Sequence, residues 1–241
     1  MVIDDLANRP HECELLLDQT YGRLSEDYSS LLPRNATILC GTEYALLRPE
    51  FSEWRSYSLA RRKCNSLKNI LITMGGADKD NFTGIVLEEL KLSVLPADCK
   101  ITVIMGETAP WVNEVKKITQ SLDWDAEVLI GVTNMAELMA ESDLAIGAAG
   151  STSWERCCLG LPTITVVLAE NQKYISKNLS KSGASLAIDF NGLQSAIEVV
   201  SSLRKLRDLS VKSSIICDGV GVERVVNFLS GIKSESFHTG R

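Results

Sequence analysis

The sequence has 241 residues, enough to bury one large hydrophobic core or one core and part of a second. With 45% hydrophobic and 23% charged residues, its composition is that of a globular protein. The net charge of −6 and the isoelectric point near 5.1 argue against a nucleic-acid surface or an anionic membrane as the main partner.

The cysteines and histidines limit the kinds of site that the chain could carry. The seven cysteines form no CxxC pair and no metal-ligand spacing, and the first residues do not read as a signal peptide. We therefore expect reduced thiols and a cytoplasmic protein. Only His11 and His238 could add imidazole ligands, and no apolar run reaches transmembrane length, so we expect no metal, no cofactor and no membrane partner.

The first 66 residues hold few regular elements. Met1–Asp5 predicts the end of a strand, Glu14–Asp18 a second short strand, and Arg48–Lys63 a connecting helix. Because this segment is too small to form its own core, we expect residues 1–47 to pack as part of something larger and residues 48–66 to be a linker helix.

From residue 67 onward, short apolar runs alternate with amphipathic segments. The runs predict strands at Asn69–Met74, Ile101–Met105, Glu127–Ile130, Leu144–Ile146, Thr163–Leu168 and Ser185–Ile188. The segments between and after them predict helices at Phe82–Leu92, Trp111–Leu122, Met135–Glu141, Ser153–Leu159, Gln172–Ser180 and Leu193–Leu203.

This alternation predicts right-handed βαβ units and a parallel sheet covered by helices on both faces. The fold class is therefore α/β, with one complete Rossmann-like domain over residues 67–225, followed by the end of a C-terminal helix and a tail at 226–241.

Ligands of open parallel sheets bind outside the carboxyl ends of the strands, so the turns at these ends are the candidate site. Gly75 and Gly76 follow the first strand of this domain. Paired glycines let the backbone approach a ligand closely, but an ordinary turn between strand and helix explains them equally well.

The turn after the third strand contains Val132, Thr133 and Met135. A ligand base could lie against this backbone and be read by main-chain hydrogen bonds. The alternative is purely structural, because Asn134 and Glu137 have the spacing of a capping box.

Two neutral amides, Asn171 and Gln172, follow the fifth strand. Amides offer both donors and acceptors to a sugar or a ribose. The alternative is that Asn171 is the N-cap of the next helix.

The turn after the fourth strand reads GAAGSTSWE and spans residues 147–155. Thr152 and Glu155 fit a capping box, but a cap does not explain the four small residues of 147–150. Those residues leave space in front of a helix start, where free N–H groups favour an anion, and Glu155 suits the hydroxyls of a ribose. The turn thus indicates either a helix cap or a nucleoside diphosphate site at Gly150, Ser151, Thr152, Ser153 and Glu155.

Several stretches resemble the family of nucleotide-sugar hydrolases of pseudaminic acid biosynthesis. They are DDLANRPHECELLLDQ, YALLRPEF, MGGADKDN and the block from Gly131 to Gln172, and the resemblance runs from about Val2 to Glu223. The family acts on UDP-2,4-diacetamido-2,4,6-trideoxy-β-L-altropyranose and is related to peptidoglycan glycosyltransferases with the GT-B fold. The resemblance implies two Rossmann-like domains facing each other across a cleft, with UDP on the C-terminal domain.

The resemblance also implies a role for each turn. Gly75 and Gly76 would lie near the phosphates and the Val132–Met135 turn near uracil. The hydroxyl residues Ser151–Ser153 would lie under the pyrophosphate, and Glu155 would bind the ribose. Asn171 and Gln172 would border the sugar. Family members hydrolyse the bond between C1 and the phosphate oxygen with inversion and release UDP, without a metal.

One family motif, Gly-x-Gly-His-x-x-Arg, supplies the general base and does not occur in this sequence. By this resemblance we expect that the sequence starts partway through the first domain, with residues 1–47 as the remnant of that N-terminal domain, and that the catalytic histidine lies in a missing N-terminal segment. His11 lies in RPHEC, which the family has in addition to its catalytic histidine, so we interpret it as a turn residue.

Three functions remain open from the sequence. The chain could be part of a UDP-sugar hydrolase, weakly active alone, in a pathway that modifies flagellin. It could be a UDP-binding half-protein without catalysis of its own. It could also be the donor-binding domain of a GT-B glycosyltransferase. In each case we expect a monomer that binds a UDP-sugar and that needs the missing domain or a complementary chain.

Overall fold

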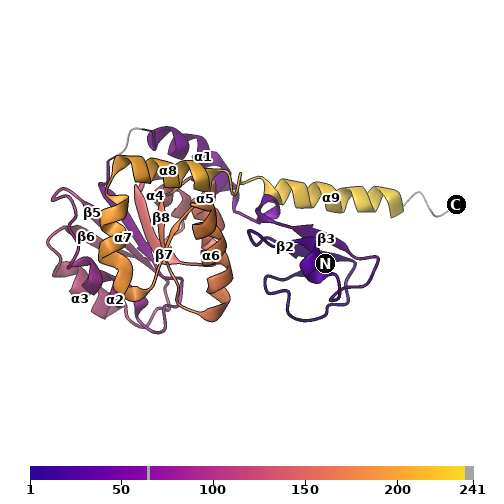
Figure 1. The fold of residues 1–241 in the computed structure, drawn as a ribbon, viewed down its shortest axis with the longest axis horizontal. Helices are drawn as coiled ribbons and strands as arrows, with labels where there is room; N and C mark the ends of the chain where they lie inside the picture. The colour runs from indigo at the N-terminus through magenta and orange to yellow at the C-terminus, as the bar shows by residue number, and fades with distance from the viewer. Residues whose placement is uncertain (64–65, 237–241) are drawn as a thin grey trace.

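The computed structural model describes residues 1–63 and 66–236, without the side chains of Asn171, Phe190 and 232–236. In this part, the chain forms a larger unit around a six-stranded sheet and a smaller unit around a three-stranded sheet (Figure 1). His238 lies outside the described residues.

The larger sheet confirms the predicted parallel α/β architecture. Its strands are β4 (Asn69–Thr73), β5 (Lys100–Met105), β6 (Asp125–Ile130), β7 (Leu144–Ala148), β8 (Thr163–Val166) and β9 (Leu186–Ile188). All neighbours run parallel, in the order β6-β5-β4-β7-β8-β9. The order proceeds outward from β4 on one side and from β7 on the other, so the switch point of the sheet lies between these two strands.

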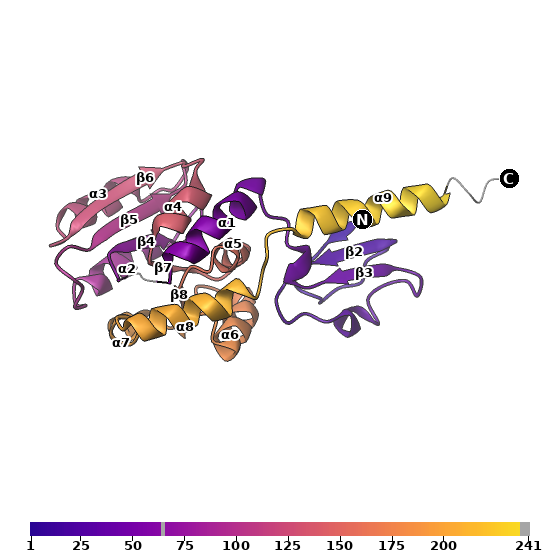
Figure 2. The same cartoon turned by 90° about the horizontal axis from the view of Figure 1, so that it is seen from above.

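Helices cover both faces of this sheet (Figure 2). One face packs against α2 (Phe82–Leu90), α3 (Val112–Gln120), α7 (Leu193–Val200) and α8 (Leu203–Ser214). The other packs against α1 (Pro49–Arg61), α4 (Met135–Glu141), α5 (Thr152–Cys158) and α6 (Lys173–Ser182).

Strand β4 illustrates why the strands are apolar throughout. Ile70 and Ile72 belong to the core on the first face, whereas Leu71 between them belongs to the core on the second face. Successive side chains of a strand point to opposite sides, so a sheet that is covered twice needs apolar residues at every position.

Two predictions were wrong in detail. The segment predicted as one helix over Leu193–Leu203 is divided between α7 and α8, because Ser202 takes an extended conformation and its hydroxyl caps α8 by accepting from Lys205 N at 3.2 Å. The smaller unit also contains a strand, β3 (Thr37–Cys40), that the sequence analysis missed.

The smaller unit combines the two ends of the chain. Its strands β1 (Val2–Ile3), β2 (Leu15–Asp18) and β3 are parallel, and the helical turns η1 (Ser25–Tyr28) and η2 (Thr42–Tyr44) flank β3. The last helix, α9 (Gly221–Ser236), lies along this sheet in both views, and Val225 packs with Leu15, Leu17 and Leu39. The apolar cluster of the smaller unit is therefore completed by residues from the far end of the sequence.

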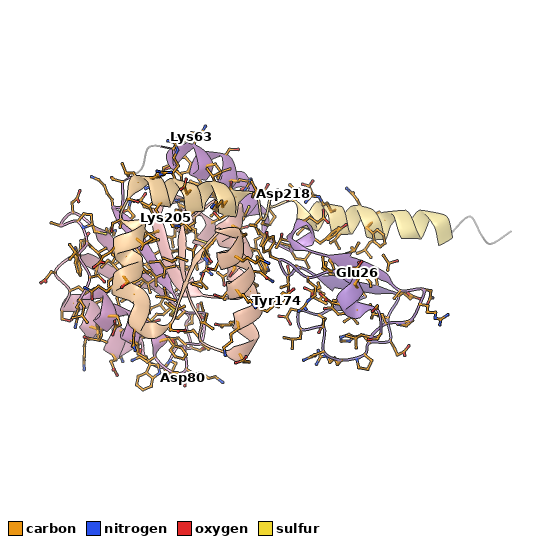
Figure 3. All side chains as sticks on the ribbon, viewed as in Figure 1. Glu26, Lys63, Asp80, Tyr174, Lys205 and Asp218 are labelled. Atoms are coloured by element: carbon orange, nitrogen blue, oxygen red, sulfur yellow. The ribbon has the colours of Figure 1, made fainter. Side chains whose placement is uncertain are left out.

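Asp218 marks the connection between the two units, just before α9 (Figure 3). Arg224 on α9 donates to both carboxylate oxygens of Asp218, at 2.9 and 2.5 Å, and to the carbonyl of Glu43 at 2.9 Å. The start of α9 is thereby tied to the segment that follows β3.

Candidate functional site

A pocket of about 240 Å³ lies at the switch point of the larger sheet. It is lined by residues at the carboxyl ends of β4, β5 and β6 and at the start of α5: Thr73, Gly75, Gly76, Ile104, Met105, Gly106, Gly131, Val132, Met135 and Thr152. The structure thus brings together five predicted site residues, Gly75, Gly76, Val132, Met135 and Thr152, at the position where open parallel sheets bind ligands. We call this pocket the switch-point pocket.

A second pocket of about 210 Å³ lies between the two units and is called the interdomain pocket here. Its lining from the larger unit is Ala149, Gly150, Ser151, Trp154, Gln172, Tyr174 and Ile175, and its lining from the smaller unit is Asp5, Gln19 and Thr20. Ser151 lines the interdomain pocket and its neighbour Thr152 lines the switch-point pocket, so the start of α5 separates the two.

The turn before α5 does not form the predicted capping box. The N-cap is Ser151, with no side-chain capping bond, and Thr152 is already the first helical residue. In the described part of the chain, the N–H groups of Ser151 and Thr152 donate to no protein acceptor. The hydroxyl of Ser153 accepts from the N–H of Gly150 at 3.3 Å. Two backbone donors are therefore left for a ligand at the junction of the two pockets.

Glu155 is half-buried on the first turns of α5, near Arg48. Burial raises the pKa of this carboxyl group, and the positive charges of Arg48 and Arg156 partly oppose the rise. Arg48 also forms an ion pair with Glu50 at 2.9 Å and donates to the carbonyl of Thr133 at 3.3 Å. The charge of Arg48 thus acts on Glu155 while its side chain bonds to the turn after β6, a relation that the sequence analysis missed.

The turns after β4 and β5 approach each other closely. Gly75 has a φ of +96°, which favours glycine, and no atom lies within 4 Å of the position that its Cβ would take. A Cβ on Gly106 would overlap the carbonyl of Gly76. Glycine at these positions leaves the mouth of the switch-point pocket open, as a ligand-binding turn requires.

The turn after β6 differs from its expected cap. Asn134 is the N-cap of α4 but makes no side-chain bond to the helix backbone, and its amide instead donates to the carboxylate of Glu137 at 2.7 Å. Val132 and Met135 line the switch-point pocket, whereas Thr133 is exposed and contributes its carbonyl to Arg48.

The two amides after β8 lie in a short helical turn, η3 (Glu170–Gln172). The N-cap of α6 is Gln172, so the interpretation of Asn171 as that cap was wrong. The side chain of Asn171 lies outside the described part of the structure. Gln172 accepts from the N–H of Leu168 at 3.0 Å and lines the interdomain pocket.

His11 packs against the smaller sheet. Its Nε2 lies 3.5 Å from the carboxylate of Asp4, and its side chain is 12% exposed. Neither pocket is lined by His11, although Asp5, next to Asp4, lines the interdomain pocket.

The described residues contain neither a group suited to a metal ion nor a membrane-spanning helix. No group of three or more histidine, cysteine, aspartate or glutamate side chains is placed to hold a metal ion. Among the helices of that part, none is long and apolar enough to cross a bilayer.

Solved structures of nucleotide-sugar enzymes share the fold of this chain. Acinetobacter baumannii MurG superposes with a TM-score of 0.66 at 17% identity, over 91% of this chain and 60% of that one. A Staphylococcus aureus MnaA–UDP structure superposes with a TM-score of 0.62 at 19% identity, over 92% and 61%. The fold is that of the GT-B class, and likeness at these identities shows the fold alone.

Residues 69–212 match the model of the glycosyltransferase family 28 C-terminal domain. The match covers more than half of the sequence, and the chain belongs to this family.

Curated proteins of three organisms are similar to this chain in sequence. The uncharacterized protein MJ1062 of Methanocaldococcus jannaschii is 35% identical over 135 residues, 55% of this chain and 28% of that protein. The UDP-2,4-diacetamido-2,4,6-trideoxy-β-L-altropyranose hydrolase of Campylobacter jejuni is 28% identical over 175 residues, 73% of this chain and 60% of the enzyme. SpsG of Bacillus subtilis, a spore coat polysaccharide biosynthesis protein, is 25% identical over 205 residues, or 82% and 59%. The chain spans 28% to 60% of the length of these relatives.

Proposed function

We propose that the chain binds the UDP part of a UDP-sugar at the switch point of its larger sheet. The observation that carries the proposal is the pair of N–H groups at Ser151 and Thr152, which have no acceptor among the described residues and lie where the two pockets meet. N–H groups grouped in this way favour an anion, and a diphosphate offers several oxygens as acceptors.

The remaining predicted residues fit around a diphosphate held there. Uracil would lie in the switch-point pocket against Val132 and Met135, with Gly75 and Gly76 near the phosphates. Thr133 would contribute through its backbone, and Ser153 would hold Gly150. The ribose would lie toward Glu155, whose ionised carboxylate can accept from vicinal hydroxyls.

The sugar would occupy the interdomain pocket. Its side toward the larger unit offers Gln172 beside Asn171, and its side toward the smaller unit offers Asp5, Gln19 and Thr20. Carboxylate, amide and hydroxyl groups are suited to the hydroxyl and acetamido groups of a pyranose.

For the complete protein we propose hydrolysis of the bond between C1 of the sugar and the phosphate oxygen, with inversion. Support comes from the similarity to the C. jejuni hydrolase over 73% of this chain. Water attacks C1 while UDP leaves as an anion, and the N–H groups at the start of α5 would stabilise the negative charge that develops on the leaving group. We assign the role of activating the water to none of the residues of this chain.

Glycosyl transfer is the second candidate, because the family match and the MurG likeness are both to glycosyltransferases. The two reactions use the same donor site and differ in the acceptor. Product analysis with the corresponding UDP-sugar distinguishes them, since hydrolysis yields the free sugar and UDP without any acceptor. For residues 1–241 alone, we expect UDP binding but little release of sugar.

Titration with UDP and with 2′-deoxy-UDP tests the nucleotide site. Wild type should bind UDP more tightly than the deoxy analogue, and Glu155→Ala should weaken UDP binding by about 10-fold to 100-fold, as expected for a charge-assisted hydrogen bond of about 1.5–3 kcal/mol. The variant should also lose the preference for UDP over the deoxy analogue.

Glu137→Ala is the matched control, because Glu137, like Glu155, is a carboxylate in the first turn of a helix, and it accepts a hydrogen bond from Asn134. It should retain the preference. An unchanged preference in Glu155→Ala would remove Glu155 from the ribose site, and the absence of UDP binding in wild type would overturn the proposed function.

A further inference from the structure

Arg156 is a buried cation directly behind the turn that precedes α5. Only 2% of the surface of Arg156 is exposed to solvent. The guanidinium Nη2 donates to the carbonyl of Ala148 at 2.7 Å and to the hydroxyl of Ser153 at 3.1 Å. Ser153 in turn accepts from the N–H of Gly150. One guanidinium therefore holds both ends of the segment that leads into Ser151.

Gly147 is shaped around the same side chain. A Cβ at Gly147 would overlap Nη1 of Arg156 and would lie 2.8 Å from the carbonyl of Thr73. Position 147 near the end of β7 has no side chain because the guanidinium occupies the space beside it. Arg156 reaches the turn from within the protein, on the side away from solvent.

The hydrogen bonds of Arg156 are incomplete. Nε and Nη1 are buried and have no hydrogen-bond partner among the described residues, and no carboxylate of that part forms an ion pair with the guanidinium. Burial lowers the pKa of Arg156 to about 10, so the side chain remains a cation at neutral pH. A buried charge without a paired countercharge opposes folding.

Arg62 shows how a buried guanidinium is satisfied elsewhere in this protein. It is 7% exposed and donates from Nε to Ser58 Oγ and the carbonyl of Leu159, from Nη1 to the carbonyl of Ser142, and from Nη2 to the carbonyl of Met139. Every nitrogen of Arg62 has an acceptor, which accounts for its burial by structure alone. The same account does not hold for Arg156.

We infer that Arg156 is a positioning residue of the diphosphate site, a buried countercharge that acts on the bound anion through the turn of residues 147–151. The guanidinium binds the carbonyl of Ala148 and the hydroxyl of Ser153, which accepts from the N–H of Gly150. These two oxygen atoms therefore point away from the ligand, and the N–H groups of Ser151 and Thr152 remain available to it. Its own positive charge adds to the attraction, because charges interact strongly where solvent screening is weak. The inference rests on the proposed function, and it adds a residue that the ligand does not touch.

The test compares two ligands that differ only in the diphosphate. Wild type, Arg156→Met and Arg156→Lys are titrated with UDP and with uridine by ligand-observed NMR. Arg156→Met should weaken UDP binding by about 10-fold to 100-fold, the range of a lost electrostatic contact, and uridine binding by less than about threefold. Arg156→Lys keeps the charge but not the planar fork, and should show a smaller loss that is still specific to UDP.

Arg62→Met is the matched control, because it also removes a buried guanidinium. It should lower the melting temperature without changing the ratio of UDP to uridine affinity. Equal losses for both ligands in the Arg156 variants, or no loss, would overturn the inference. If Arg156→Met does not fold, the ratio measured for Arg156→Lys decides alone. Failure of wild type to bind UDP would instead overturn the proposed function together with this inference.

Discussion

The hydroxyl of Tyr174 on α6 donates a hydrogen bond to the carbonyl of Gly22 in the smaller unit, 2.7 Å away. Figure 3 labels Tyr174 where the larger unit faces the smaller one. The guanidinium carbon of Arg23 lies 4.6 Å from the centroid of the same ring, and Tyr174 also lines the interdomain pocket. The side chain of Tyr174 therefore connects the two units at the edge of the proposed sugar site.

Tyr174→Phe should loosen this connection. The variant keeps the ring and its contact with Arg23 but loses one partly exposed hydrogen bond, so the free energy of unfolding should fall by about 0.5–1.5 kcal/mol. Amide hydrogen exchange should increase at residues 19–24, while UDP affinity should stay within about twofold because the proposed UDP site lies on the other side of Ser151.

Tyr57→Phe is the control, since Tyr57 is 48% exposed and its hydroxyl has no recorded hydrogen bond in the described part of the chain. Unchanged exchange at residues 19–24 in Tyr174→Phe would show that the bond does not hold the units together.

The pH dependence of UDP binding should depend on Glu155. Burial raises the pKa of this group, so its carboxylate becomes protonated at a higher pH than that of an exposed glutamate. In the proposed site the ionised carboxylate accepts from the ribose hydroxyls, and this form is present above the pKa and lost below it. The ratio of affinities between wild type and Glu155→Gln should therefore be greatest where the carboxylate is ionised and should shrink as the pH falls through its raised pKa. Because UDP itself titrates equally in both measurements, a constant ratio would contradict the assignment.

The two glycines that flank the turn before α5 should respond differently to alanine. Gly150→Ala should fold as stably as wild type, because no atom lies within 4 Å of the added Cβ, and should weaken UDP binding because the methyl group enters open space at the interdomain pocket. Gly147→Ala should lower the free energy of unfolding by about 1–3 kcal/mol, because its methyl group would overlap Arg156. Thermal denaturation and UDP titration of both variants measure the two effects. The same loss of stability and the same loss of UDP affinity in both variants would contradict the account.

Tyr28 should stabilise the smaller unit in a pH-dependent manner. Its hydroxyl lies 2.9 Å from Oδ2 of Asp4 and 2.7 Å from Oδ2 of Asp18, and all three residues are buried. Burial alone acts to raise the pKa of Asp4, but hydrogen bonds from the N–H of Ala7 and from Tyr28 outweigh it and hold the pKa below its ordinary value. A lowered carboxyl pKa stabilises the fold above the unfolded value near 3.9, and this stability is lost as the pH falls.

Tyr28→Phe should therefore cost about 1–3 kcal/mol near pH 7 and less below about pH 4. Urea denaturation at both pH values measures the difference, with Tyr44→Phe as the control for loss of a partly buried hydroxyl. A cost that is the same at both pH values would argue that Tyr28 acts by packing alone.

The sequence predicted the larger unit well because each strand of its sheet is a distinct apolar run. It did not predict the strand order, which is decided by contacts between segments far apart in the chain. The division between α7 and α8 was missed because Ser201 and Ser202 interrupt a continuous amphipathic pattern only briefly. Strand β3 was missed because its apolar stretch is less distinct than that of β2, which has the same length but holds three consecutive leucines.

The candidate site was predicted in part, for a similar reason. Turn residues such as Gly75 and Ser151 follow strands directly, so the strand-end rule indicates them. The same rule applied to β1 and β2 would have indicated Asp5 and Thr20, which line the interdomain pocket. Arg48, Tyr174 and Arg156 could not be found in this way, because their roles depend on contacts that exist only in the folded chain.

A crystal structure of the chain with UDP at saturating concentration tests the central claim most directly. The account predicts that the diphosphate oxygens accept hydrogen bonds from the N–H groups of Ser151 and Thr152, with the ribose at Glu155 and uracil against Val132. Unoccupied pockets on both sides of Ser151, or UDP bound at another surface, would contradict it.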